Sequence, residues 1–72
     1  MDRLLVNSSN LVSVGYDAAA QALEVEFQSG NVYTYFDVPE TVYQSLMTAD
    51  SKGEFFHDNI LKEFDYADTK ES

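Results

Sequence analysis

The stretch LEVEFQSGNVYTYF, residues 23–36, decides the fold because it alternates apolar and polar side chains on both sides of a glycine. Alternation with a period of two is typical of half-buried β-strands. Gln28-Ser29-Gly30 lies between the two runs, and glycine tolerates the left-handed conformation that the third position of a three-residue hairpin loop requires. The stretch therefore predicts a β-hairpin of strands at about residues 22–28 and 31–36.

The length of the loop determines which side chains share a face of this hairpin. A two-residue Ser29-Gly30 loop would shift the pairing by one residue and reverse both faces. We favour the three-residue loop because it gathers five apolar side chains on one face: Leu23, Val25, Phe27, Tyr33 and Tyr35. It places Val25 opposite Tyr33 and Leu23 opposite Tyr35. The other face then carries Glu24, Glu26, Val32 and Thr34.

A third strand is predicted upstream of the hairpin, at residues 11–16. Here apolar and small residues alternate, so we expect Val12, Val14 and Tyr16 on one face. Ser13 and Gly15 are expected on the other. The following segment, residues 17–21, is too short to stand as a helix despite its alanines, and we expect a turn. Residues 1–10 end in the polar cluster Asn7-Ser8-Ser9-Asn10, which is typical of a loop before the first strand.

Two amphipathic helices are predicted after the hairpin. Pro39 suits a first helical turn, and Asp37 and Glu40 place negative charge at the positive end of the helix dipole. This helix spans about residues 39–48, with a stripe of Val42, Tyr43, Leu46 and Met47. Ser51 and Glu54 have the capping-box spacing, which predicts a second helix at about residues 52–61. Its inner side is expected to consist of Phe55, Phe56, Asn59 and Ile60.

Together these elements predict an α+β fold, a three-stranded antiparallel meander covered on one face by two short C-terminal helices. We expect a single domain over residues 1–72, with its core at about residues 8–64. Phe64 and Tyr66 would pack loosely. The acidic tail, residues 65–72, is expected to be frayed.

Composition narrows the classes of function. The chain has 72 residues and a formal net charge of -9, and a field of that sign opposes contact with phosphate groups. It has no cysteine, which excludes disulfides and thiolate metal sites. The longest apolar run near the start is only Leu4-Leu5-Val6, so we expect neither a targeting segment nor a membrane span, and a cytoplasmic location.

The order of these motifs resembles the KTSC family, a small domain found at the C-terminus of some lysyl-tRNA synthetases and as free-standing bacterial proteins. The resemblance covers about residues 8–64. It rests on Ser8-Ser9-Asn10, Gly15-Tyr16-Asp17, residues 23–27, Ser29-Gly30, Tyr33-Thr34-Tyr35, Asp37-Val38-Pro39, Val42-Tyr43, Leu46, Ser51-Lys52-Gly53, Phe55-Phe56 and Asn59-Ile60. The function of the family is not established, and RNA binding has been suggested for it. In this chain, Thr34, Phe36 and Leu61 stand where members of the family often carry basic residues.

Tyr33 and Tyr35 are the leading candidates for a binding site. Aromatic side chains on a strand can stack on nucleobases. The alternative is that both rings belong to the core, with their hydroxyls at the edge of the domain. The predicted register favours the alternative in which both rings belong to the core.

The remaining polar candidates point to solvated surface rather than to catalysis. Glu24 and Glu26 share the outer face of a strand, where they could join Asp50, Glu54 and Asp58 in an acidic patch around an apolar spot at Val32. His57 is the only histidine, and its neighbour Asp58 is expected to point elsewhere on the helix. Ser51 could act as a nucleophile with His57 as its base, but the predicted role of Ser51 in the capping box already explains this serine. We expect no metal, no cofactor and no enzymatic activity.

These observations predict a small non-catalytic interaction module of KTSC type. We expect a protein partner bound through the outer sheet face or an edge strand, with Glu24, Glu26, Val32, Thr34, Tyr33 and Tyr35 as candidate binding residues. One alternative is an RNA- or nucleotide-binding domain in which Tyr33 and Tyr35 stack on bases. Another is an acidic, phage-type inhibitor that occupies the basic groove of a nucleic-acid-binding protein. Binding to polymeric nucleic acid is expected to be negligible.

Overall fold

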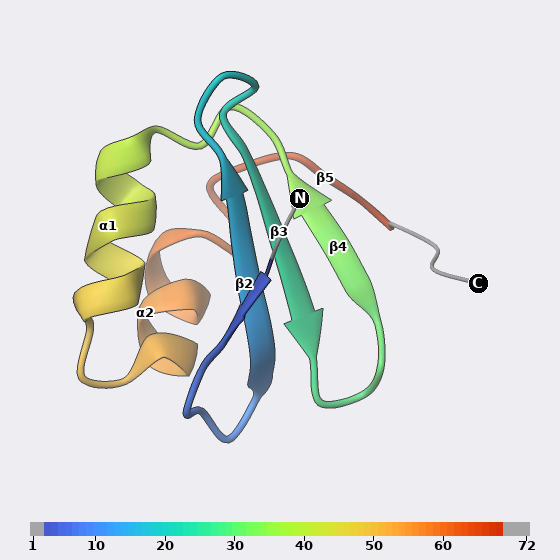
Figure 1. The fold of residues 1–72 in the computed structure, drawn as a ribbon, viewed down its shortest axis with the longest axis vertical. Coiled ribbons are helices and arrows are strands. Elements are labelled where there is room, and N and C mark those ends of the chain that lie inside the picture. The colour runs from blue at the N-terminus through green and yellow to red at the C-terminus, as the bar shows by residue number, and fades with distance from the viewer. Residues whose placement is uncertain (1–2, 69–72) are drawn as a thin grey trace.

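The computed structural model describes residues 3–68 and shows a five-stranded antiparallel sheet with two helices on one of its faces (Figure 1). The elements are β1 (Arg3–Leu5), β2 (Leu11–Asp17), β3 (Ala22–Phe27), β4 (Val32–Tyr35), α1 (Glu40–Thr48), α2 (Lys52–Asn59) and β5 (Tyr66–Asp68). The strands lie side by side in the order of the chain. The predicted α+β class is therefore confirmed, but the prediction of three strands is wrong.

The central hairpin has the predicted register. Val25 pairs with Tyr33 and Leu23 pairs with Tyr35. The loop is closed by a hydrogen bond from the Phe27 amide to the Asn31 carbonyl at 2.9 Å, and Gly30 has a φ of 96°. Gly30 thus occupies the third position of the predicted three-residue loop, where the left-handed conformation is required and glycine adopts it without a steric penalty.

Strand β2 departs from strict alternation near its start. The pairing with β3 shifts between Leu11 and Ser13, which is a bulge. Leu11 consequently belongs to the buried core, whereas Val12 is only half-buried. The expectation that Val12 joins Val14 and Tyr16 on the apolar face is thus wrong, because an extra residue in one strand re-aims the side chains beside it.

The two additional strands form the edges of the sheet. β1 pairs with β2 and precedes the polar cluster at residues 7–10, in a part of the chain where no strand was predicted. β5 pairs with β4, within the tail that was predicted to be frayed, although residues 69–72 of that tail lie outside the described residues. Each strand has only three residues, too few to show a clear alternation, and each depends on the neighbouring strand for its conformation.

Both helices lie close to their predicted bounds. Pro39 is the N-cap of α1 rather than its first residue. At α2 the Ser51 hydroxyl accepts a hydrogen bond from the Glu54 amide at 3.3 Å, which is the first half of the predicted capping box. Ile60 follows α2 as its C-cap, so the helix is shorter than predicted.

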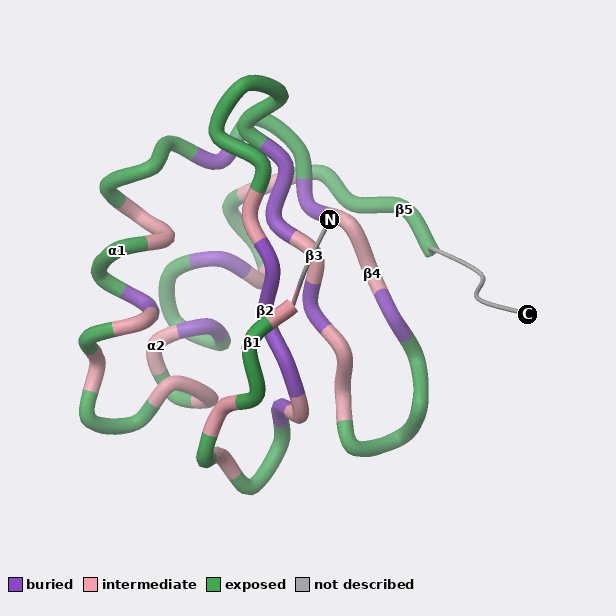
Figure 2. The backbone as a smooth tube through the Cα atoms, in the orientation of Figure 1, coloured by how far each residue is buried: buried purple, intermediate pink, exposed green. Residues whose placement is uncertain are grey.

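The core lies between the sheet and the helices. Figure 2 shows buried segments along β2, β3 and the inward sides of both helices. The buried cluster comprises Leu11, Val14, Leu23, Val25, Tyr35, Val38, Leu46, Phe56 and Ile60, with Phe64 partly buried against it. Asn59 was predicted to face inward, but it is exposed, and its amide donates to the Phe55 carbonyl instead. In the part of the chain that the structure describes, neither helix is long and apolar enough to cross a bilayer.

Candidate functional site

The outer face of the sheet, opposite the helices, carries a polar network in which the carboxylates of Glu24 and Glu26 have partners. Arg3 of β1 contacts Glu24 at 2.8 Å and approaches Glu26 at 3.9 Å. The hydroxyl of the buried Ser13 donates to the Glu26 carboxylate at 2.8 Å. The two glutamates are thus paired and half-buried, and the expectation that they form a solvated face is wrong. The cause is β1, which brings Arg3 onto this face.

The predicted acidic patch does not assemble. Glu24 and Glu26 lie on the outer face, whereas Asp50, Glu54 and Asp58 lie on or beside α2, across the sheet from them (Figure 1). Val32 is 4% exposed, so it is not an apolar spot on the surface. Thr34, its neighbour on the same face, is half-buried.

Tyr33 and Tyr35 lie on the helix side of the sheet, as the register predicts. Tyr35 is 1% exposed, and its ring contacts Phe56 and Tyr66 at centroid distances of 5.3 Å. Tyr33 is half-buried between Phe27 and Tyr66. In this fold the Tyr35 ring is therefore closed to a nucleobase. Burial, with smaller contributions from Tyr66 and Tyr33, raises the pKa of Tyr35 to about 12.

Tyr16 joins β2 to the segment that precedes α1. The Tyr16 hydroxyl donates to the Val38 carbonyl, and the Val38 amide donates to the Gln21 carbonyl at 2.9 Å. Gln21 and Asp37 both adopt positive φ angles, of 52° and 59°, beside this contact. Burial, followed by the charges of Glu40 and Asp17, raises the pKa of Tyr16. These bonds fix the chain where it passes from the sheet to the helices.

The only histidine is on the surface. The His57 Nδ1 lies 3.4 Å from the Asp58 carboxylate, and both side chains are more than half exposed. The expectation that Asp58 points away from His57 is wrong, since the exposed side chains turn toward each other. Within residues 3–68, no three histidine, aspartate or glutamate side chains are grouped so that they could hold a metal ion.

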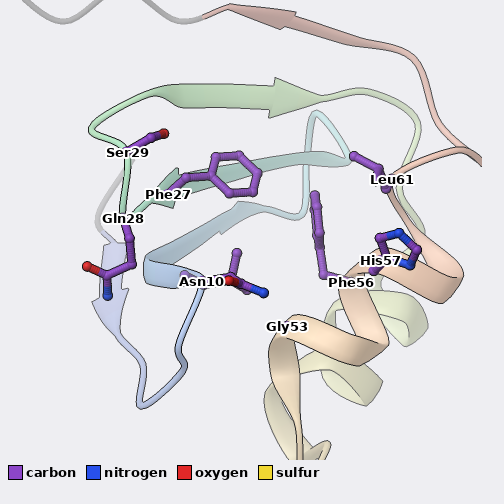
Figure 3. Close-up of a pocket in the computed structure, with 9 residues that line it drawn as sticks. Asn10, Phe27, Gln28, Ser29, Gly53, Phe56, His57 and Leu61 are labelled. Carbon is purple, nitrogen blue, oxygen red and sulfur yellow. The ribbon is translucent and has the colours of Figure 1, made fainter.

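A pocket of about 340 Å³ opens between α2, the start of β2 and the β3–β4 turn (Figure 3). Its lining residues are Asn10, Leu11, Phe27, Gln28, Ser29, Gly53, Phe56, His57 and Leu61. Sequence reasoning missed this site because the lining comes from separate segments that only the fold brings together. A Cβ at position 53 would lie 3.1 Å from the Ser8 hydroxyl, so glycine allows α2 to approach the loop before β2. Gly53 is therefore the one local hint of the pocket in the sequence.

The outermost strand β1 exposes two leucines. Leu4 is 57% exposed and Leu5 is 84% exposed. Leu4 pairs with Val14 and Leu5 with Ser13, so the two side chains point to opposite faces of the sheet. Among the described residues, β1 pairs on one side only, with β2.

Comparison with known proteins assigns the chain to a family. A model of the KTSC domain matches residues 7–64, most of the chain. The chain belongs to the KTSC domain family. The match contains β2, β3, β4, α1 and α2, and it leaves out the two edge strands.

Relatives of this KTSC domain include free-standing proteins and parts of synthetases. An uncharacterised protein of Stutzerimonas stutzeri is 51% identical over 57 residues, which are 79% of this chain and 80% of that protein. A lysine–tRNA ligase of Trichormus variabilis is 49% identical over 51 residues, 71% of this chain but 9% of the ligase. The crystal structure of a KTSC domain protein from Yersinia pestis has a TM-score of 0.94 and 38% identity, and covers 96% of this chain and 97% of its own.

Proposed function

We propose that this KTSC domain is a non-catalytic module that binds a protein partner by adding a strand of the partner to the edge of β1. The exposure of Leu4 and Leu5 on that edge carries the proposal. In strand addition, backbone hydrogen bonds provide affinity, and side chains that alternate between the two faces provide specificity. A partner strand beside β1 would meet a leucine on each face.

The residues of β1 favour its use as a binding edge, because they provide little protection against the addition of another strand. Proteins protect sheet edges with short strands, charges, prolines or covering segments. β1 is short and carries Arg3, but Arg3 turns to Glu24 and Glu26 on the outer face. The two leucines that follow have no such protective role. At the opposite edge, β5 is equally short, and its Tyr66 ring packs against Tyr33 and Tyr35 although it is 55% exposed, whereas Leu5 of β1 is 84% exposed.

The polar chemistry of the chain supports binding rather than catalysis. A general base requires a substrate-facing position and a partner that orients it. Among residues 3–68, the polar contact of His57 is an exposed one with Asp58, and the Ser51 hydroxyl caps α2. The net charge of -9 favours a partner whose surface is basic.

Site-specific photocrosslinking in the native host tests the proposal. A photoreactive amino acid is placed at Leu5, and a matched control carries it at Ala67, which is also exposed on the outer face but lies on the opposite edge strand. We expect one protein to crosslink from position 5 and not from position 67. Leu5→Lys should weaken binding of that purified protein without changing the stability of the domain. Crosslinking of the same protein from position 67 alone would contradict the proposal.

A further inference from the structure

We infer that the pocket between α2 and the β3–β4 turn binds a small planar aromatic molecule that carries no negative charge. This activity is separate from the proposed strand addition, which uses β1. Three properties carry the inference: the size and aromatic walls of the pocket, its polar rim and the net negative charge of the chain.

The size and the walls fit one or two flat rings. A volume of about 340 Å³ lies at the small end of the range for ligand sites in proteins, which is roughly 300–1,000 Å³. Phe27 and Phe56 meet there at a centroid distance of 5.4 Å with planes 69° apart. Their rings point into the space between the sheet and α2 (Figure 3), and Leu61 closes one side. Aromatic rings stack on or meet such walls edge to face more favourably than saturated rings do.

The polar groups of the pocket are placed around this apolar interior. Asn10 and Ser29 contribute an amide and a hydroxyl, and the His57 imidazole lies beside Phe56 (Figure 3). A hydrogen bond from the Gln28 amide to the Asn10 carbonyl at 2.9 Å holds the two loops of the rim together. A few polar groups around an apolar interior orient a ligand that has an apolar body and a polar edge.

The net charge of the chain disfavours anions. Close to the pocket, Glu54 and Asp58 flank His57 along α2, while Lys52 and Lys62 are the chain neighbours of the lining residues Gly53 and Leu61. The whole chain has a net charge of -9. An anionic ligand would enter against this field, whereas a neutral or cationic aromatic molecule would not. The class of ligand is therefore an uncharged or positively charged aromatic ring with a hydrogen-bonding substituent.

Three matched probes test this inference on the whole chain by NMR: benzamide, benzoate and cyclohexanecarboxamide. We expect benzamide to shift the amide signals of Gln28, Ser29, Gly53 and His57 saturably, with a dissociation constant on the order of millimolar for so small a molecule. Benzoate should bind several-fold more weakly at low salt, and the difference should shrink as salt is added. Cyclohexanecarboxamide, which has the same polar group but no flat ring, should also bind several-fold more weakly.

Variants tie the binding to the pocket. Phe27→Leu removes an aromatic wall and should weaken benzamide binding roughly 2- to 10-fold. Phe55→Leu is the matched control, because Phe55 is also half-buried but does not line the pocket, and it should leave binding unchanged. If Phe27→Leu does not fold, Leu61→Ala takes its place, with Val42→Ala as its control.

Several results would overturn the inference. These are the absence of saturable shifts at the pocket amides up to the solubility limit of benzamide, equal binding of benzamide and cyclohexanecarboxamide, and benzoate binding as tightly as benzamide at low salt. Equal effects of Phe27→Leu and Phe55→Leu would also overturn it. None of these outcomes bears on the β1 edge, whose test uses residues on a different strand.

Discussion

Phe27 of β3 and Phe56 of α2 meet edge to face, with ring centroids 5.4 Å apart and planes at 69°. Phe56 also contacts the Tyr35 ring at 5.3 Å, so one helical side chain packs against two neighbouring strands. The contact joins α2 to the sheet, and the same two rings line the pocket. This pair of side chains thus contributes both to the packing of α2 on the sheet and to the wall of the pocket.

Phe56→Leu should lower the free energy of unfolding by roughly 1–2 kcal/mol, because it removes buried ring atoms and two edge-to-face contacts. Phe55→Leu on the same helix should cost less, because Phe55 is only half-buried. Urea unfolding followed by circular dichroism measures both. Equal losses would mean that Phe56 is not the main contact between α2 and the sheet.

Stability should decline in strong alkali because of Tyr35. The pKa of this tyrosine is raised to about 12 in the folded chain, from 10.0. The folded state therefore keeps the proton more tightly, so the stabilisation is complete below pH 10 and is lost as the pH rises toward about 12, by an amount on the order of 2 kcal/mol. Ultraviolet titration of phenolate should show an ionisation near pH 12 that the Tyr35→Phe variant lacks. Tyr35→Phe should flatten the decline, and an unchanged decline would contradict the role of Tyr35.

The hairpin at residues 23–36 could be predicted from the sequence because its alternation and Gly30 are local features. The same holds for the Ser51 cap and for the stripe of α1. The edge strands could not be predicted, since Arg3–Leu5 and Tyr66–Asp68 become strands only by pairing with neighbours. The pairing of Arg3 with Glu24 depends on β1. Because β1 was not predicted, Glu24 and Glu26 were expected to be solvated. The pocket could not be predicted because its lining residues, such as Asn10 and Phe56, lie far apart in the chain and only the fold brings them together.

Gly53 and Ser8 should be energetically coupled. A Cβ at position 53 would lie 3.1 Å from the Ser8 hydroxyl, which accepts hydrogen bonds from the Asn10 and Leu11 amides. In the wild-type chain this crowding should offset the gain of up to about 1 kcal/mol that alanine brings to a helix. In a Ser8→Ala background, Gly53→Ala should be more favourable than in the wild type. A double-mutant cycle measures the difference, and strictly additive effects would contradict the close approach.

Binding to nucleic-acid polymers should be negligible at physiological salt. Non-specific affinity comes from counterions released by lysine and arginine, and this chain has four such residues against thirteen acids. One of the four, Arg3, is paired with Glu24. Fluorescence anisotropy with single-stranded and duplex oligonucleotides across a salt series is the measurement. Sub-micromolar affinity that falls steeply with salt would favour the RNA-binding hypothesis instead.

Amide hydrogen exchange at β1 tests strand addition most directly, once crosslinking at position 5 has supplied the partner. A strand added to this edge forms new backbone hydrogen bonds, so exchange in residues 3–5 should slow in the complex while exchange in residues 66–68 stays unchanged. The Leu5→Lys variant at the same partner concentration should show little slowing. Protection that is confined to residues 66–68 or to the helices, with residues 3–5 exchanging as in the free domain, would contradict the proposal that β1 is the binding edge.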